Sequence, residues 1–320
     1  MHCLSAALAV TALVRDAALE PPAVGMHADT PVDVDMSTVT KFAILSQARS
    51  GSTWLNTMLN GHPRILSYGE YLSEYAGANR DNDGLVCKPL QRLAEFRDAA
   101  NLLECHEWNY DDKRVWANAS QSGPVALGFK WFNNQGGWDL DYARHRGEKC
   151  PKTGCRMCKE PSEFIGWLRE HRAKLIVLVR DASLSHFISE VKHDESGNFQ
   201  CQDSACAEGT ASEKVFVDLD RLRRWLRYTE DYWTMMRQFS KDVGTERYIL
   251  SYEQLSKDPE GYAKKLFSFL GLEPVTVSTE QTLKMGGTRM RDSIENANEV
   301  AEALRGTPYE GQVDAIDGAH

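Results

Sequence analysis

The sequence predicts an α/β protein with three layers, in which a central parallel sheet is flanked by helices. Three apolar runs have the composition of strands buried on both faces, at 41–46 (KFAILS), 125–132 (VALGFKWF) and 173–179 (AKLIVLV), and a weaker run lies at 247–251 (RYILS). Segments with helical spacing separate these runs. Because strands that alternate with helices form parallel sheets covered on both faces, this order predicts the fold class.

The chain starts with a segment that we expect to lie outside the folded domain. Residues 4–14 (LSAALAVTALV) are apolar but fall short of the roughly 20 residues that span a bilayer. They are either the core of a weak signal peptide or part of a disordered leader, since no Lys or Arg precedes them. Pro, Asp and Ala are frequent in 17–40, as in a linker. The folded domain is therefore expected at 41–310, and 311–320 is expected to be a tail.

A short polar loop follows the first predicted strand, at 47–52 (QARSGS), and a helix is expected to begin near Thr53. A loop between a strand and a helix directs backbone N–H groups and the positive end of the helix dipole toward one point, which makes an anion site. Gly51 allows close approach of the backbone, Ser52 adds a hydroxyl, and Arg49 adds charged donors. The alternative is a Ser or Thr helix cap beside a surface Arg. The Walker A pattern GxxxxGK[ST] is absent.

Two later segments are predicted helices that pack on the core. The segment 215–241 carries apolar residues at helical spacing, which indicates core packing and not a cofactor site. These residues are Leu219, Leu222, Leu226, Tyr232, Met236 and Phe239. The segment 259–270 (PEGYAKKLFSFL) has Pro259 at its start and Gly271 just past its end, where helices favour these residue types.

The charge of the chain restricts its partners. The formal net charge of −9 argues against nucleic acid as a partner, because such binding depends on Lys and Arg neutralising phosphates. It does not exclude an anionic small molecule, since a basic pocket needs only a few residues. No apolar run approaches the length of a transmembrane segment.

At 49–55, RSGSTWL resembles the phosphosulfate-binding loop of sulfotransferases, which transfer a sulfuryl group from 3'-phosphoadenosine-5'-phosphosulfate (PAPS). Further segments resemble the carbohydrate-type members of this superfamily, including the trehalose and Nod-factor sulfotransferases. They are SYGEYL at 67–72, GFKWF at 128–132, LIVLVRDASLSHFIS at 175–189, SYEQL at 251–255, FSFLGLEP at 267–274 and SIENANEVAEALRGTPY at 293–309. The resemblance spans 41–309 and implies a P-loop-type fold.

The resemblance implies where the cofactor binds. It assigns the 5'-phosphosulfate side to Arg49, Ser50, Gly51, Ser52, Thr53 and Trp54, and the 3'-phosphate to Arg180 and Ser189. In many members the gap between the last two positions is one residue shorter, which would place Ile188 there and leaves Ser189 and Ser185 as alternatives. An Arg at a strand end and a hydroxyl on the next helix can converge on one phosphate. Arg180 could instead form a surface ion pair with Asp181.

Transfer to an acceptor needs a base near the attacking atom and cations near the departing phosphate. Cytosolic sulfotransferases place a His two residues after a Lys on the second strand, but here Phe132 stands two residues after Lys130. The resemblance leaves Glu70 as the base and Lys130 as the second cation. Glu70 could instead be an exposed charge at a helix start, and Lys130 a strand-edge Lys that reaches solvent. His186 and His193 are second choices for the base.

Five of the eight cysteines lie in a predicted insertion at 150–206: Cys150, Cys155, Cys158, Cys201 and Cys206. They indicate either disulfide bonds in an oxidising compartment, which we favour, or a zinc site in a reducing one. The odd count leaves one Cys free or paired with Cys87 or Cys105. The sequon at Asn118 agrees with the lumen of the secretory pathway or with secretion, in preference to the cytoplasm.

The leading hypothesis is a sulfotransferase with PAPS as co-substrate, no required metal, and a small-molecule or carbohydrate acceptor that offers a hydroxyl or an amine. A P-loop small-molecule kinase is the first alternative, although its GK[ST] loop is missing. A non-catalytic nucleotide-binding module is the second. The acceptor is not identified, because acceptor loops vary and the aromatic residues between the strands could either stack on a sugar or pack in the core. These residues include Trp108, Tyr110, Trp116, Trp131 and Trp138.

Overall fold

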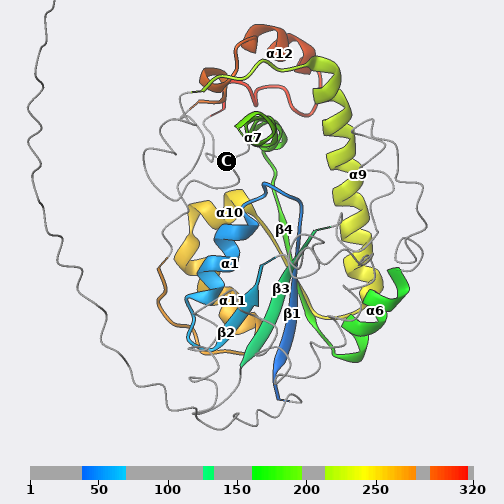
Figure 1. Ribbon diagram of the computed structural model, residues 1–320, viewed down its shortest axis with the longest axis vertical. Helices are drawn as coiled ribbons and strands as arrows, with labels where there is room; N and C mark the ends of the chain where they lie inside the picture. Colours follow the sequence, from blue (N-terminus) through cyan, green and yellow to red (C-terminus); the bar gives the residue numbers. More distant parts are fainter. Residues whose placement is uncertain (1–37, 70–124, 133–160, 197–212, 279–288, 316–320) are drawn as a thin grey trace, which may run out of the picture. The chain divides into compact units, whose positions relative to one another are not determined.

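A computed structural model describes residues 38–69, 125–132, 161–196, 213–278 and 289–315 (Figure 1). The predictions for the signal peptide, Glu70, the sequon at Asn118 and all the cysteines lie outside these residues. Among the described helices, none combines the length and the apolar character needed to cross a membrane.

The described strands form one parallel sheet of five strands in the order β2-β3-β1-β4-β5. Their bounds are β1 (Thr40–Ser46), β2 (Ile65–Tyr68), β3 (Ala126–Phe132), β4 (Lys174–Val179) and β5 (Arg247–Ser251). The predicted class is therefore confirmed, and each predicted strand lies within a residue of its expected bounds. Strand β2 was not expected, because its four residues (ILSY) are too few for a periodic pattern to stand out.

Helices cover both faces of this sheet (Figure 1). Their bounds are α1 (Ser52–Asn60), α6 (Pro161–Glu170), α7 (Ser183–Ser196), α9 (Leu219–Val243), α10 (Tyr252–Lys257), α11 (Pro259–Phe269) and α12 (Ala297–Leu304), and a short 3₁₀ helix η3 spans Met290–Ser293. Helices α1, α10 and α11 pack on one face, and α6 and α9 pack on the other. This arrangement gives the three expected layers.

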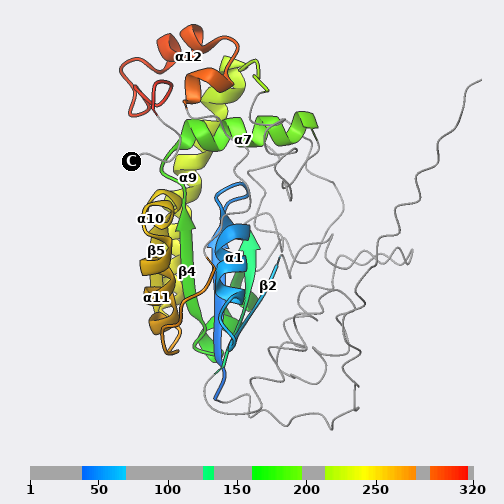
Figure 2. The same cartoon turned by 90° about the vertical axis from the view of Figure 1, so that its left-hand side faces the viewer.

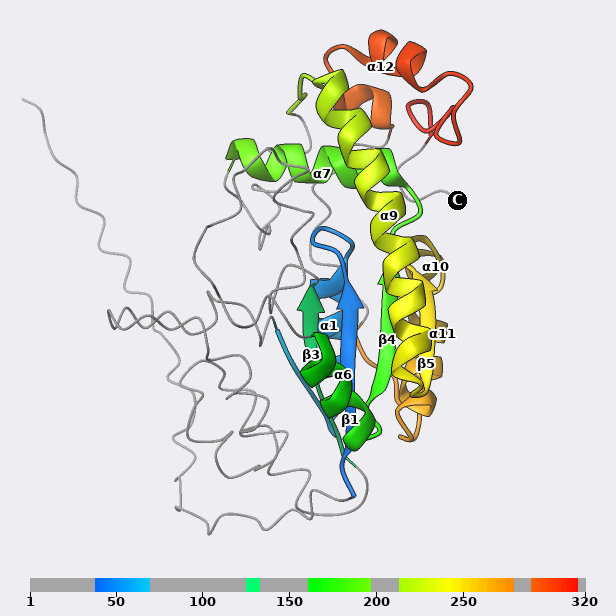
Figure 3. The same cartoon turned by 90° about the vertical axis from the view of Figure 1, so that its right-hand side faces the viewer.

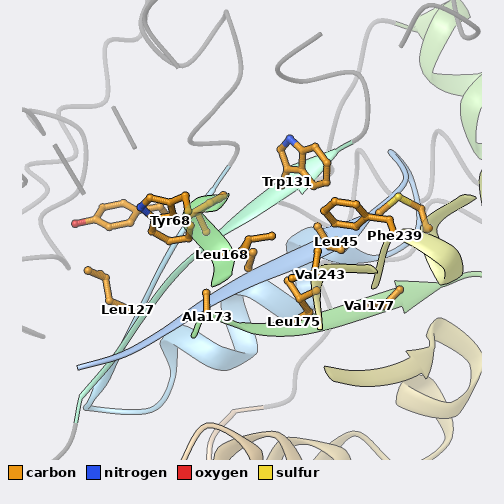
Figure 4. Close-up of a cluster of buried hydrophobic side chains, with 14 of the residues drawn as sticks. Leu45, Tyr68, Leu127, Trp131, Leu168, Ala173, Leu175, Val177, Phe239 and Val243 are labelled. Atoms are coloured by element: carbon orange, nitrogen blue, oxygen red, sulfur yellow. The ribbon is translucent and has the colours of Figure 1, made fainter. Parts of the chain in front are cut away.

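Alternate residues of β1 face the two layers, as a strand between two layers requires. Phe42 and Ile44 pack with residues of α1, α10 and α11. Ala43 and Leu45 pack in the opposite core with residues of α6 and α9. Figure 4 shows this second core, where Leu45 lies among side chains from neighbouring strands and from α9, including Phe239.

The long helix α9 confirms the apolar stripe predicted from the sequence. It begins after Asp218, whose side chain accepts a hydrogen bond from the Arg221 N–H, and this cap explains why the preceding residues of the predicted segment are not helical. The stripe residues are buried except Leu219, which is partly buried. The second predicted helix is α11, with Pro259 as its first residue and Gly271 at φ 82° shortly after its end.

Helix α7 lies across the carboxyl ends of β1 and β4 (Figures 2 and 3). It packs in a third core with α12, the N-terminal part of α9 and the bridge between Val215 and Ile294. Residues near the end of the described chain join this core: Val313 is buried, and the Gln312 side chain accepts a hydrogen bond from the Leu184 N–H at 2.9 Å. The carboxyl edge of the sheet is thereby covered by α7.

Candidate active site

The loop after β1 turns tightly into α1. The Gln47 carbonyl accepts hydrogen bonds from the Ser50 N–H at 3.3 Å and from the Ser50 hydroxyl at 2.6 Å. Gly51 occupies the N-cap position of α1 at φ 83°, and no side chain caps the helix. The alternative of a Ser or Thr cap is therefore wrong, and the start of α1 retains the positive dipole end that anions prefer.

Gly51 is required by its neighbour as well as by its backbone angle. A Cβ atom at this position would lie 2.4 Å from Cδ2 and 2.8 Å from Cε2 of Tyr252, the first residue of α10. The Tyr252 ring thus lies directly against the loop. The resemblance-based prediction did not include this contact.

Arg180 directly follows β4 and lies beside the same loop. Its Nη1 donates a hydrogen bond to the Arg49 carbonyl at 2.7 Å, and its Nη2 donates to the Ser185 hydroxyl at 2.5 Å. Its guanidinium carbon lies 4.9 Å from the centre of the Tyr252 ring. Because Arg180 is only 7% exposed, the alternative of a surface ion pair does not describe it.

Arg49 reaches from the loop to α7, where its Nε donates a hydrogen bond to the Ser189 hydroxyl at 3.2 Å. The structure therefore places both candidate serines at the site, Ser185 on Arg180 and Ser189 on Arg49. Ile188, which the resemblance would put at the position of that Ser, is buried in the third core.

Two guanidinium groups thus lie close together in a largely buried site. Burial lowers the pKa of Arg49, the Glu190 charge raises it, and the Arg180 charge lowers it. Because both side chains are positively charged, each disfavours the charged form of the other. A bound anion would relieve this repulsion and would satisfy donors at the start of α1, so the residues fit the phosphates of PAPS.

Lys130 lies on β3, between β2 and β1, and is only 5% exposed. The alternative of a strand-edge Lys is therefore wrong. Its Nζ donates a hydrogen bond to the Thr53 hydroxyl at 3.2 Å, in the first turn of α1. The next residue, Trp131, points to the opposite core and packs against Phe239. The structure brings Lys130, Arg49 and Arg180 to the same edge of the sheet.

Comparison with known proteins identifies the family of this chain. A profile described as "Sulfotransferase family" matches residues 42–276, which is well over half of the chain. The chain belongs to the sulfotransferase family. Sulfuryl transfer from PAPS is the activity of this family, which favours that reaction over the kinase alternative.

Three bacterial proteins are similar to this chain in sequence or in structure. Over 277 residues the sulfotransferase is 21% identical to nodulation protein H of Rhizobium meliloti, with 84% of this chain and 92% of the relative covered. The sulfotransferase domain of the Synechococcus PCC 7002 olefin synthase is 20% identical, with a TM-score of 0.32 and coverage of 77% and 81% of the two chains. A sulfotransferase from Alicyclobacillus acidocaldarius is 14% identical, with a TM-score of 0.38 and coverage of 83% and 92%.

The three candidate bases of this sulfotransferase differ in burial and in whether the structure describes them. Glu70 lies outside the described residues, although the preceding Gly69 carbonyl accepts a hydrogen bond from the Lys130 N–H at 3.0 Å. His186 is fully buried, and burial together with the Arg180 charge lowers its pKa to about 3. Its Nε2 bonds to the Ala48 carbonyl, so His186 is not placed to accept a proton from an acceptor. His193 lies half-buried in the last turn of α7.

Sequence reasoning did not find two carboxylates near Arg180 and Arg49, those of Glu253 and Glu190. The Glu253 carboxylate accepts hydrogen bonds from the Asp181 and Ala182 N–H groups, at 3.0 and 3.1 Å, just before α7 begins. Glu190, buried on α7, is the carboxylate that raises the pKa of Arg49. The segment SYEQL contains Glu253, but its contacts depend on strand pairing that no local pattern reports.

The loop after β1 also contains a buried side-chain amide, that of Gln47. The Gln47 side chain is 3% exposed, and neither its oxygen nor its nitrogen has a hydrogen-bond partner among the described residues. An unsatisfied buried amide destabilises a fold by about 1–3 kcal/mol. No group of three or more His, Cys, Asp and Glu side chains in the described ranges is placed to hold a metal ion.

Proposed function

We propose that this protein transfers a sulfuryl group from PAPS to a hydroxyl of a carbohydrate-type acceptor. The observation that carries the proposal is the pair of arginines at the ends of adjacent strands, where Arg180 Nη1 contacts the Arg49 carbonyl at 2.7 Å beneath α7. Two cationic side chains and the start of α1 at one edge of the sheet favour a ligand that carries more than one anionic group. A nucleotide with phosphates at both its 3' and 5' positions is such a ligand.

The two halves of the site would bind different phosphates. The loop from Arg49 to Thr53 and the start of α1 offer backbone and hydroxyl donors to the 5'-phosphosulfate, and Trp54 follows within α1. Arg180 would bind the 3'-phosphate together with Ser185, which accepts a hydrogen bond from Arg180, or with Ser189, which accepts one from Arg49. Both roles use charge-assisted hydrogen bonds, which are the strong ones in proteins.

PAPS supplies the sulfuryl group and a phosphate leaving group. The acceptor oxygen forms a bond to sulfur as the bond between sulfur and the bridging phosphate oxygen breaks, and the acceptor proton passes to a base. We propose Glu70 as that base. The burial and low pKa of His186 support this choice, since they remove one rival. Arg49 and Lys130 would stabilise the charge that develops on the departing phosphate.

The class of acceptor rests on the carbohydrate-type segments at 67–72 and 293–309 and on the similarity to nodulation protein H. An assay would supply PAPS labelled with sulfur-35 and offer chito-oligosaccharides, trehalose and a phenol in parallel. We expect label on a carbohydrate, with loss of transfer in Arg180→Ala and retention in Arg224→Ala, which removes an exposed Arg of α9. Transfer to the phenol alone would contradict the acceptor class, and absence of transfer to every acceptor would favour the binding module.

A further inference from the structure

The loop residue Arg49 has an uncommon backbone conformation. Its φ of 62° lies in the left-handed region, which residues with a Cβ atom adopt only when their surroundings hold them there. Two contacts hold the carbonyls of this segment. His186 Nε2 lies 2.5 Å from the Ala48 carbonyl oxygen, and Arg180 Nη1 lies 2.7 Å from the Arg49 carbonyl oxygen. The carbonyls on both sides of the left-handed residue are therefore fixed.

The protonation state of His186 follows from its contacts. A carbonyl oxygen can only accept, so Nε2 carries a hydrogen and donates it to Ala48. Nδ1 is buried and has no hydrogen-bond partner within the described ranges, which suits a neutral ring with a bare Nδ1. Trp225 of α9 packs against this ring in a T-shaped arrangement, with centroids 5.3 Å apart. The imidazole is thus held between α9 and the loop.

We infer that His186 is a positioning residue for the phosphosulfate loop: its Nε2–H holds the Ala48 carbonyl and thereby keeps Arg49 in the left-handed conformation that directs its guanidinium to Ser189. The role deepens the proposed function, on which its link to PAPS rests. In this role His186 touches neither the acceptor nor the sulfuryl group. It acts through Arg49.

A neutral histidine suits this position for an electrostatic reason. Arg49 and Arg180 already repel each other, and both charges lower the pKa of His186. A Lys or Arg in its place would donate the same hydrogen bond but would add a further positive charge to a buried site. A neutral imidazole supplies the donor without that charge.

The first test needs no ligand and compares the structures of two variants. Gln can offer an N–H near the position of Nε2, whereas Leu fills space without a donor. We expect Arg49 to keep a positive φ in His186→Gln and to move to a negative φ in His186→Leu. Val191→Ala on the same helix, which loses packing in the third core, controls for general loosening of α7. An unchanged positive φ in His186→Leu would overturn the inference.

The second test measures binding of 3'-phosphoadenosine-5'-phosphate by calorimetry. We expect His186→Leu to bind about tenfold more weakly than wild type, as loss of a buried hydrogen bond predicts, with His186→Gln and Val191→Ala near wild type. In an Arg49→Ala background, His186→Leu should have little further effect, because the two residues act as a unit. Additive effects would contradict action through Arg49. If wild type fails to bind the nucleotide, the proposed function fails, while the variant structures still decide the role of His186.

Discussion

Replacement of Gly51 by Ala tests the geometry of the loop with a single methyl group. The added Cβ would occupy a left-handed position at φ 83°, which destabilises a residue other than Gly by about 1–2 kcal/mol. It would also lie 2.4 Å from Tyr252 Cδ2, and overpacking of this kind destabilises by about 1–3 kcal/mol. We therefore expect Gly51→Ala to lower the free energy of unfolding by about 2–5 kcal/mol, measured by chemical denaturation.

A double-mutant cycle separates the two causes. The overlapping atoms are Cδ2 and Cε2 of Tyr252, and Tyr252→Val has neither. In that background we expect Gly51→Ala to lower the free energy of unfolding only by the amount due to the left-handed backbone. The coupling energy between the two substitutions should then be about 1–3 kcal/mol. A loss below about 1 kcal/mol in the wild-type background, or a coupling near zero, would refute the contact between the loop and α10.

Four further predictions concern single side chains. Arg180→Ala should weaken binding of 3'-phosphoadenosine-5'-phosphate by about 1.5–3 kcal/mol and remove the preference for it over 5'-AMP; calorimetry that shows an intact preference would reassign the 3'-phosphate. Lys130→Met should lower the single-turnover rate by about 10²–10³-fold if it stabilises the departing phosphate, and a rate near wild type would exclude that role. Glu70→Gln should slow the same step by about 10²–10⁴-fold at nearly unchanged nucleotide affinity, whereas a loss below about tenfold would move the base elsewhere. Burial and the nearby arginines lower the pKa of His186 to about 3, so the unfolded chain binds a proton at this residue before the folded protein does. The contribution of His186 to stability should therefore be complete above about pH 6.5 and decline toward pH 3 by up to about 1.4 kcal/mol per pH unit. Chemical denaturation of wild type and His186→Gln at several pH values measures this decline.

Most of the fold could be predicted from the sequence, because strands buried on both faces can be recognised from their apolar composition alone. The runs that became β1, β3 and β4 are continuous and apolar, and they remain buried in the structure. Strand β2 escaped notice because it has only four residues and contains Ser67. The loop could also be recognised, since its Gly, Ser and Arg stand at a boundary between a strand and a helix.

The contacts that shape the site could not be predicted in the same way. Ala48 and His186 are separated by 138 positions and meet only because β1 and β4 are neighbours in the sheet. The sequence suggested His186 as a second choice for the catalytic base. In the structure it is buried against the Ala48 carbonyl, which indicates a positioning role. Tyr252 belongs to the segment SYEQL, but its contact with Gly51 could not be predicted, because packing of a ring against a glycine produces no periodic pattern in the sequence.

Calorimetry of the wild-type protein with three nucleotides tests the central claim most directly. The paired arginines predict that 3'-phosphoadenosine-5'-phosphate binds at least about tenfold more tightly than 5'-AMP, since each charge-assisted hydrogen bond to the 3'-phosphate contributes about 1.5–3 kcal/mol. ADP, which lacks the 3'-phosphate, should also bind more weakly than the bisphosphate. Equal affinity for the bisphosphate and 5'-AMP, or a preference for ADP, would contradict the assignment of Arg49 and Arg180 to one PAPS site.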